Sequence, residues 1–153
     1  MYSDFGYFGS EKAVLVGVIM VATAYLIGNI SPAIILGRKR NIDIKKEGSG
    51  NAGTTNVLRV MGKKAAIVTL LVDILKGVLA VVLGGVLGGK TVAAICVIAV
   101  FTGHVWPVFF GFKGGKGVAT TFGALTGYNV ILGFSALGVV IIGVLISKRM
   151  SFG

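Results

Sequence analysis

The sequence is poor in the residues that build metal centres and covalent cross-links. It has one cysteine, one histidine and five carboxylates among 153 residues. Cys96 alone cannot form a disulfide or a thiolate metal site within one copy of the chain. His104 has no second histidine or cysteine placed to bind a metal ion with it. We therefore expect no metal ion and no cofactor.

Charged residues are also scarce: they make up 13% of the chain, whereas hydrophobic residues make up 55%. In soluble domains about a quarter of the residues are charged. The mean hydropathy is +0.94, and the uncharged run 13–37 exceeds the ~20 residues that a helix needs to cross a membrane. The preceding residues, with Asp4, Glu11 and Lys12, lack the positive flank of a secretory signal, so we expect nothing to be removed. These features indicate an integral membrane protein.

The apolar regions predict an all-α fold, a polytopic integral membrane helical bundle. An alternating barrel pattern is absent, and a helix satisfies its own backbone hydrogen bonds in lipid. Gly89 and Lys90 are nearly all that joins two of these regions, which predicts a tight hairpin. We expect one domain over residues 1–153, with spans at 13–37, 65–89 and 91–112, a further apolar region at 118–146, and a polar stretch at 38–64.

The region 118–146 is long for one span and short for two, and the triplet "GYN" at 127–129 is its one turn-like break. Two crossings, the first of them short, would leave only Lys12 and Lys90 among the flanking cations on the far side of the membrane. A single crossing would add Lys148 and Arg149 to that side. The positive-inside rule therefore favours two crossings, an amino terminus outside the cytoplasm, and polar loops facing the cytoplasm.

The net charge is +10, which in a soluble protein would suggest nucleic acid. Here the cations flank membrane segments, so we interpret them as orientation signals and as contacts for anionic lipid, with no nucleic acid partner. Binding of an anionic substrate is compatible with both roles. The sequence does not determine the oligomeric state.

The stretch "GSGNAGTTNVLR" at residues 48–59 formally contains the dinucleotide pattern G-x-G-x-x-G. The context excludes a nucleotide fold, because the preceding "NIDIKKE" is no buried strand. Glycines can still let successive N–H groups converge on an anion. A flexible hydrophilic connector is the alternative. The polar side chains that could assist anion binding are Ser49, Asn51, Thr54, Thr55 and Asn56.

The stretch "GFKGGKGVAT" at residues 111–120 invites comparison with a P-loop but does not match one. Phe110 stands where the first glycine is required, and Gly117 stands where a serine or threonine should hold magnesium. Lysines among glycines directly after an apolar helix are costly unless they bind something. Phosphate is the natural ligand, and lysines that extend to the membrane interface are the alternative.

Two further positions carry ionisable groups within apolar sequence. His104 lacks the aspartate five residues on that acyltransferases pair with histidine, because Phe109 stands there; it is either a hydrogen-bonded structural residue or a recruited general base. Asp73 and Lys76 are three residues apart on one helical face, so we expect them to pair. A clamp for helix packing is the role that this pair favours.

The stretches "SGNAGTTN" at 49–56, "DILKG" at 73–77 and "GHVWPVFFGFKGGKGVAT" at 103–120 closely resemble the bacterial acyl-phosphate:glycerol-3-phosphate acyltransferases, the PlsY-type membrane enzymes. The resemblance implies transfer of a fatty acyl group from acyl phosphate to the first hydroxyl of glycerol 3-phosphate in phospholipid synthesis. The expected products are lysophosphatidate and phosphate. It also implies a multi-pass protein of the bacterial inner membrane and a seven-helix fold, of which this sequence holds about five transmembrane helices.

The resemblance also implies the site. Ser49, Arg59, His104 and Lys113 correspond to catalytic positions, with substrate phosphate bound by Arg59 and Lys113 and substrate positioned by Ser49 and His104. We expect direct attack of the glycerol hydroxyl on the acyl carbon, with a substrate phosphate oxygen taking the proton. The expected phosphate-binding positions are Asn51, Gly53, Thr55, Asn56, Gly114, Gly115, Lys116 and Ser151.

The sequence "SKRMSFG" at 147–153 matches the beginning of a third family motif, whose first serine is Ser151. We expect the second motif serine and the family's last two helices beyond residue 153. Two other functions stay open on the residues alone: a small transporter of an anionic solute, and a noncatalytic scaffold that holds anionic lipid.

Overall fold

The computed structural model describes residues 11–147, and within that range all of the regular structure is helical. This confirms the predicted all-α class. The helices are α1 (Glu11–Gly28), α2 (Pro32–Lys39), α3 (Thr54–Met61), α4 (Lys63–Val105), the short 3-10 helix η1 (Val108–Phe110), α5 (Val118–Tyr128) and α6 (Val130–Ser147).

The first apolar run is not one helix, and the expected span at 13–37 is wrong in this respect. α1 ends at Gly28, and Ser31 is extended, with φ −110°, before Pro32 opens α2. Proline lacks the N–H that a continuous helix would use and disfavours helical geometry at the preceding residue. The break frees the carbonyl of Ile30, which accepts a hydrogen bond from Lys76 Nζ at 2.6 Å.

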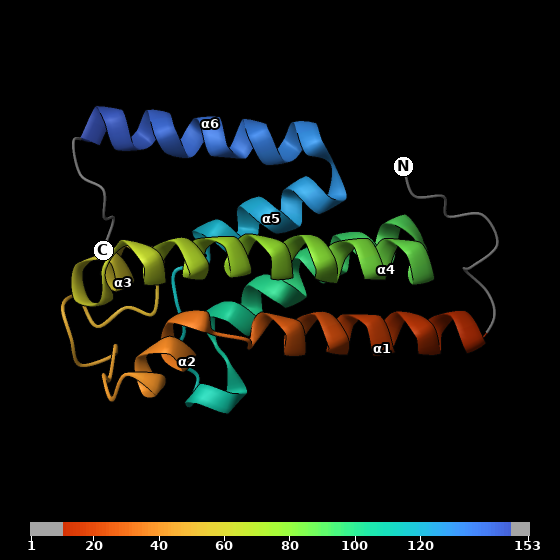
Figure 1. Cartoon of the computed structure of the whole chain (residues 1–153). Coiled ribbons are helices and arrows are strands. Elements are labelled where there is room, and N and C mark those ends of the chain that lie inside the picture. The colour runs from red at the N-terminus through yellow and green to blue at the C-terminus, as the bar shows by residue number, and fades with distance from the viewer. Residues whose placement is uncertain (1–10, 148–153) are drawn as a thin grey trace.

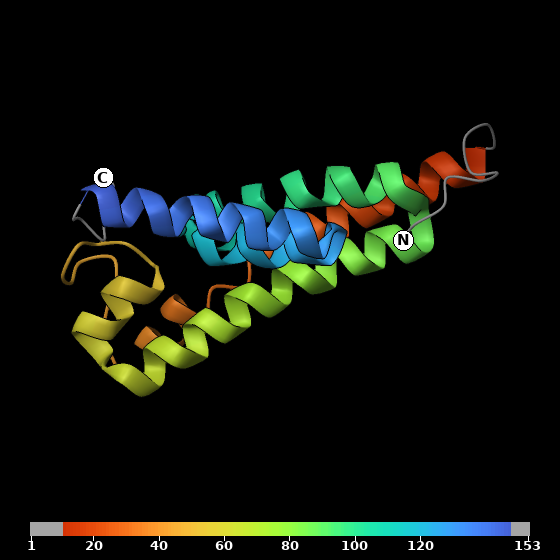
Figure 2. The ribbon, with the colours of Figure 1, turned by 90° about the horizontal axis from the view of Figure 1, so that it is seen from above.

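The predicted hairpin is present within α4, which turns back on itself at Gly89. That residue has φ 81° and ψ −176°, a conformation that favours glycine. The two arms pack closely, because a Cβ at Gly84 would meet Cys96 Sγ at 2.5 Å and one at Gly88 would meet Val92 at 2.7 Å. Figure 2 shows the arms diverging from this turn. The second arm ends at Val105, before the expected residue 112.

The apolar region 118–146 forms two helices, α5 and α6, that separate at Asn129. Asn129 is extended, with φ −156°. Its side chain caps the next helix, because Oδ1 accepts from the N–H groups of Ile131 and Leu132 at 2.9 and 3.3 Å. The 11 residues of α5 cover about 16 Å, roughly half of the hydrocarbon thickness. The division into two helices is confirmed, whereas two complete crossings stay a prediction.

Small residues let the helices approach closely, as is typical of membrane bundles. A Cβ at Gly103 of α4 would overlap the carbonyl of Tyr25 in α1, and one at Gly123 of α5 would overlap the carbonyl of Ile74. Tyr25 also donates its hydroxyl to the carbonyl of Trp106 at 2.9 Å. The second arm of α4 is thus fixed against α1, and the first arm against α5.

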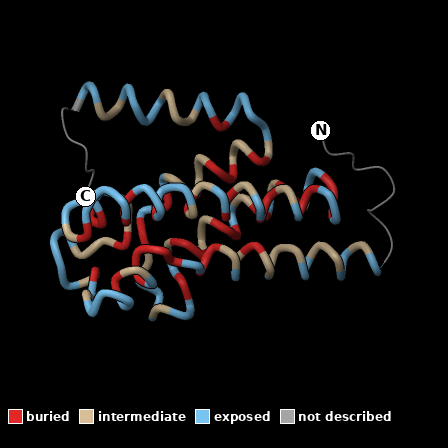
Figure 3. Tube along the Cα trace, in the orientation of Figure 1, coloured by how far each residue is buried: buried red, intermediate tan, exposed pale blue. Residues whose placement is uncertain are grey.

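The described helices expose much apolar surface. By length and composition, the stretches Glu11–Gly28 and Lys63–Phe110 could cross a membrane, and Val130–Ile146 is a shorter apolar helix. On α6, Ile131 is 76% exposed and Ile146 is 79% exposed. Figure 3 shows buried residues gathered around α2 and the loops, whereas α6 is almost wholly exposed or intermediate. Such surface suits lipid contact.

The polar segments gather at one end of the bundle (Figure 1). α2, α3 and the loop between them lie there, together with the beginning of α4. The turn of α4 and the beginning of α1 lie at the opposite end. Sequence segments that are far apart along the chain therefore meet at a single polar end.

Candidate functional site

The loop that precedes α3 is organised by Asn56, which is only 2% exposed. Its Nδ2 donates to the carbonyls of Ile44 and Glu47 at 3.2 and 2.9 Å, and its Oδ1 accepts from the N–H of Ser49 at 2.9 Å. Gly48 has φ 60°, and a Cβ there would overlap the same Oδ1. The amide of Asn56 thus holds the loop together, and its expected contact with phosphate stays a prediction.

The other expected residues of this loop have different surroundings. Asn51 Oδ1 is buried and has no hydrogen-bond partner, so it can accept a hydrogen bond from a ligand. Gly53 is the N-cap of α3. The side chains of Ser49, Thr55 and Arg59 are exposed, Thr55 in the first turn of α3 and Arg59 in its last.

The second loop folds back onto the end of α4. The N–H groups of Gly114 and Gly115 donate to the carbonyls of Val105 and His104 at 3.0 and 3.3 Å. These donors are therefore engaged inside the protein, and the expected phosphate contact of the two glycines stays a prediction. A Cβ at Gly114 would overlap the His104 carbonyl, so the close approach requires glycine.

The two loops meet at Gly115. A Cβ on this residue would overlap Nε2 of His104 and would lie 3.1 Å from the carbonyl oxygen of Ala52. Ala52 belongs to the first loop and is 1% exposed. The structure therefore brings the two glycine-rich loops and the imidazole of His104 together. This proximity is what a single site built from all three would require.

Two cations that the motifs did not single out lie beside the second loop. Lys45 Nζ donates to the carbonyl of Phe110 at 2.6 Å, and the Arg38 guanidinium lies 5.1 Å from the centroid of the Phe110 ring. Burial lowers the pKa of Lys45; Asp43 opposes this shift, and the nearby charges of Lys113 and Arg38 add to it. We call Arg38, Lys45 and Lys113 the cationic cluster.

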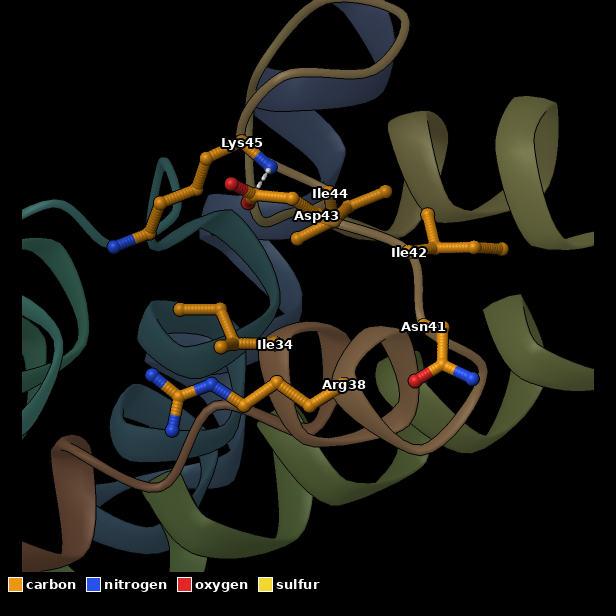
Figure 4. A pocket seen from close by; sticks show the side chains of 7 residues that line it. All are labelled: Ile34, Arg38, Asn41, Ile42, Asp43, Ile44 and Lys45. Carbon is orange, nitrogen blue, oxygen red and sulfur yellow. Dashed lines mark hydrogen bonds between the residues drawn. The ribbon is translucent and has the colours of Figure 1, made fainter.

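A pocket of about 530 Å³ adjoins this cluster. Figure 4 shows the charged ends of Arg38 and Lys45 pointing to the same side, with Ile34 between them. Like charges held close together favour an anion. In the sequence, Arg38 and Lys45 could have been found from their place in the basic run "RKRNIDIKK" at 38–46. The pocket is lined by Ile34, Arg38, Asn41, Ile42, Asp43, Ile44 and Lys45.

The expected pair of Asp73 and Lys76 is present, with Nζ and Oδ1 2.7 Å apart and both side chains 3% exposed. Lys76 Nζ also lies 2.8 Å from Nδ1 of His104. Asp73 Oδ1 lies 3.5 Å from the same nitrogen. The pair is thus more than the predicted helix clamp, because it reaches the imidazole at the junction of the two loops.

The remaining expectations have separate outcomes. Lys113 and Lys116 are exposed in the second loop. Ser151 lies outside the described residues, so its phosphate contact stays a prediction. Within residues 11–147, no cluster of three or more histidine, cysteine, aspartate or glutamate side chains could hold a metal ion.

Comparison with known proteins gives the family. The family described as glycerol-3-phosphate acyltransferase matches residues 18–153. The glycerol-3-phosphate acyltransferase of Thermoanaerobacter sp. (strain X514) is 49% identical over 137 residues, which cover 89% of this chain and 69% of the relative. The glycerol-3-phosphate acyltransferase of Clostridioides difficile (strain 630) is 45% identical over 146 residues. The match covers 89% of this chain and 70% of that relative.

Two solved structures agree with these relatives. They are PlsY (YgiH), an integral membrane glycerol 3-phosphate acyltransferase, in its glycerol 3-phosphate and lysophosphatidic acid forms. Each is 34% identical to this chain, with TM-scores of 0.78 and 0.75. The match covers 84% of this chain and 66% or 65% of the solved chain, so the chain spans about two thirds of its relatives. This chain belongs to the glycerol-3-phosphate acyltransferase family of integral membrane proteins.

Proposed function

We propose that this chain takes its acyl group from acyl phosphate, transfers it to the 1-hydroxyl of glycerol 3-phosphate, and releases lysophosphatidate and phosphate. The observation that carries the proposal is the meeting of both glycine-rich loops at Gly115 beside His104. Because both substrates carry phosphate, an end of the bundle rich in cations suits them. The family, and the glycerol 3-phosphate and lysophosphatidic acid forms of PlsY, support the same reaction.

The reaction proceeds by direct attack of the substrate hydroxyl. The hydroxyl oxygen forms a bond to the acyl carbonyl carbon, and the bond from that carbon to the phosphate oxygen breaks. The proton of the hydroxyl moves to a substrate phosphate oxygen. Within the described residues, the one histidine has its Nδ1 beside Lys76 Nζ, which gives no support to a protein base.

The side chains divide into those that bind phosphate and those that place the hydroxyl. Lys113 and Arg59 bind substrate phosphate by charge-assisted hydrogen bonds. Lys116, which lies in the same loop as Lys113, contributes to this binding. Arg38 and Lys45 extend the positive field around Lys113. Asn51, whose Oδ1 is buried without a partner, accepts a hydrogen bond from the substrate. Ser49 and His104 position the substrate hydroxyl. Gly53, Thr55 and Asn56 form the phosphate-binding part of the first loop, Gly114 and Gly115 allow its contact with the second, and Ser151 adds a further phosphate contact.

The proposal includes the location of the enzyme. The described helices suit a membrane, and the concentration of lysine and arginine at the polar end fits a cytoplasmic face by the positive-inside rule. We assign the protein to the bacterial inner membrane, where acyl phosphate enters from the lipid and glycerol 3-phosphate from the cytoplasm. Anionic lipids surround the cationic end.

The experiment supplies purified protein in detergent or vesicles with glycerol 3-phosphate and one acyl donor at a time. Acyl phosphate, acyl-coenzyme A and acylated carrier protein are compared at equal concentration. The expected result is lysophosphatidate and an equal amount of phosphate from acyl phosphate alone. Product from a thioester donor at the same rate would overturn the proposed donor. Uptake of glycerol 3-phosphate into vesicles without product would favour the transporter, and unchanged substrates outside the vesicles would favour the scaffold.

A further inference from the structure

We infer that Lys76 holds His104 as the neutral Nε2–H tautomer, so that the imidazole is a hydrogen-bond donor at the junction of the two loops rather than a general base. Lys76 is then a positioning residue that acts through His104. The tautomer follows from the contacts of Lys76 with Asp73, Ile30 and His104, and it requires that Lys76 be charged, as its ion pair with Asp73 favours. Its consequence for catalysis rests on the proposed acyl transfer.

The argument begins with the surroundings of Lys76. Its ammonium nitrogen lies 2.7 Å from Asp73 Oδ1, 2.6 Å from the carbonyl oxygen of Ile30 and 2.8 Å from Nδ1 of His104. An ammonium group carries three N–H donors and no acceptor. The carbonyl of Ile30 and Nδ1 of His104 each take one of these hydrogens, and Asp73 Oδ1 is the counter-ion of the ammonium group. A charged ammonium nitrogen has no lone pair to offer the imidazole.

This arrangement decides which nitrogen of His104 carries the hydrogen. Because Lys76 can only donate, Nδ1 must be the acceptor in the contact between them. A neutral imidazole has one N–H and one acceptor nitrogen, so the hydrogen lies on Nε2. A doubly protonated ring would place an N–H against the ammonium group, with both side chains no more than 4% exposed, and that repulsion opposes it.

The position of Nε2 gives the tautomer its function. This nitrogen faces Gly115, on the side where the carbonyl of Ala52 also lies. An N–H there presents a donor to oxygen atoms at the loop junction, whereas a bare Nε2 would present a lone pair toward a carbonyl oxygen. The first arm of α4 thereby sets the hydrogen-bonding character of the junction through Lys76.

Asp73 makes the arrangement switchable by mutation. Its Oδ1 lies 3.5 Å from His104 Nδ1, so it is an acceptor within reach when the ammonium group is removed. In Lys76→Met, the carboxylate then draws a hydrogen onto Nδ1. We expect either the Nδ1–H tautomer or a doubly protonated ring in this variant.

His104 is the sole histidine of the chain, so nitrogen NMR of protein labelled with ¹⁵N-histidine observes it directly when the purification tag contains no histidine. The expected wild-type spectrum shows a protonated Nε2 and an unprotonated Nδ1. Lys90→Met, an exposed position at the turn of α4, should leave this pattern unchanged. Lys76→Met should add a hydrogen to Nδ1. A wild-type spectrum with a protonated Nδ1 would overturn the inference even if the variant failed to fold.

A second variant removes both charges of the pair. In Asp73→Asn/Lys76→Met no ammonium or carboxylate remains near Nδ1, so we expect the ring to return to the tautomer mixture of a free imidazole, in which Nε2–H predominates but Nδ1–H is also populated. A folded double variant in which Nδ1 stays as fully unprotonated as in the wild type would contradict the role of Lys76. For acyl transfer, Lys76→Met should lower kcat about two- to tenfold, the effect of one hydrogen bond, with KM for glycerol 3-phosphate nearly unchanged. Failure of the proposed reaction would leave the NMR result standing.

Discussion

Nε2 of His104 lies directly against Gly115, so the imidazole at the end of α4 contacts the second glycine-rich loop at this residue. The carbonyl oxygen of Ala52 reaches the same side of Gly115 from the first loop. A single hydrogen atom in place of a side chain thus allows three distant segments to meet. The two glycine-rich loops lie against each other because of this contact.

Gly115→Ala should therefore reduce acyl transfer severely. The added methyl group would overlap Nε2 of His104 and press on the Ala52 carbonyl, so the loops must move apart. Because a shift of about 1 Å at a reacting centre can cost a hundredfold in rate, we expect a loss of that order in kcat/KM. The measurement is initial rates with acyl phosphate and glycerol 3-phosphate.

Gly138→Ala in α6 is the matched control. A Cβ at Gly138 meets nothing within 4 Å, and alanine favours a helix interior by about 0.5–1 kcal/mol over glycine. This variant should keep its activity and its thermal stability or gain slightly in stability. Equal rates for Gly115→Ala and the control would show that the contact with His104 does not matter for catalysis.

Asn56→Asp should loosen the first loop while it keeps nearly the same shape. The carboxylate still accepts from Ser49, but it cannot donate to the carbonyls of Ile44 and Glu47. Leaving buried groups without partners costs about 1–3 kcal/mol. We expect faster hydrogen exchange over residues 44–56 and a lower Tm. Asn41→Asp, at an exposed residue with φ 56°, should show neither change, because aspartate tolerates that conformation.

The parts of the structure that depend on local sequence were predictable. The all-α class, the hairpin at Gly89 and the division of region 118–146 follow from hydropathy and from turn residues. The uncharged run 13–37 predicts one continuous span, whereas the structure breaks it before Pro32, because hydropathy alone does not register the missing N–H of proline. The break leaves the carbonyl of Ile30 without a helical partner. A residue distant in the sequence, Lys76, donates a hydrogen bond to this carbonyl.

The positions of the two glycine-rich loops were predictable, whereas the contacts of their residues were not. The glycine-rich patterns indicated both loops, yet no pattern showed that Asn56 binds its own loop or that the N–H groups of Gly114 and Gly115 bind the end of α4. These roles depend on tertiary packing. The joining of Lys76 to His104 likewise requires the two arms of α4 to lie beside each other.

Lys45→Arg should change the pH dependence of substrate binding. Burial lowers the pKa of Lys45, Asp43 opposes this, and Lys113 and Arg38 add to it. A bound phosphate favours the protonated amine, so binding takes up a proton once the pH exceeds the lowered pKa. Affinity for glycerol 3-phosphate should therefore fall as the pH rises through that pKa. Arginine stays charged, so the fall should be absent in the variant.

The test of Lys45 measures the Kd of glycerol 3-phosphate as a function of pH above about 7.5. In this range the phosphate of glycerol 3-phosphate is almost fully ionised, because its second pKa is about 6. Lys46→Arg is the control, because Lys46 is exposed and pairs loosely with Asp43 at 3.8 Å. It should retain the wild-type pH dependence. The same slope in wild type and Lys45→Arg would exclude Lys45 as the titrating group.

Lys113→Ala and Arg59→Ala test the binding of substrate phosphate most directly. Both side chains are exposed at the polar end, so their removal should leave the Tm almost unchanged. Each deletion removes charge-assisted hydrogen bonds worth about 1.5–3 kcal/mol, which corresponds to about a ten- to hundredfold loss in substrate binding or rate. Initial rates are measured while glycerol 3-phosphate and acyl phosphate are varied separately, which shows which phosphate each cation binds.

Lys90→Ala, an exposed lysine at the opposite end, should match wild type. If Lys113→Ala and Arg59→Ala also match wild type for both substrates, these cations only anchor the chain at the membrane interface.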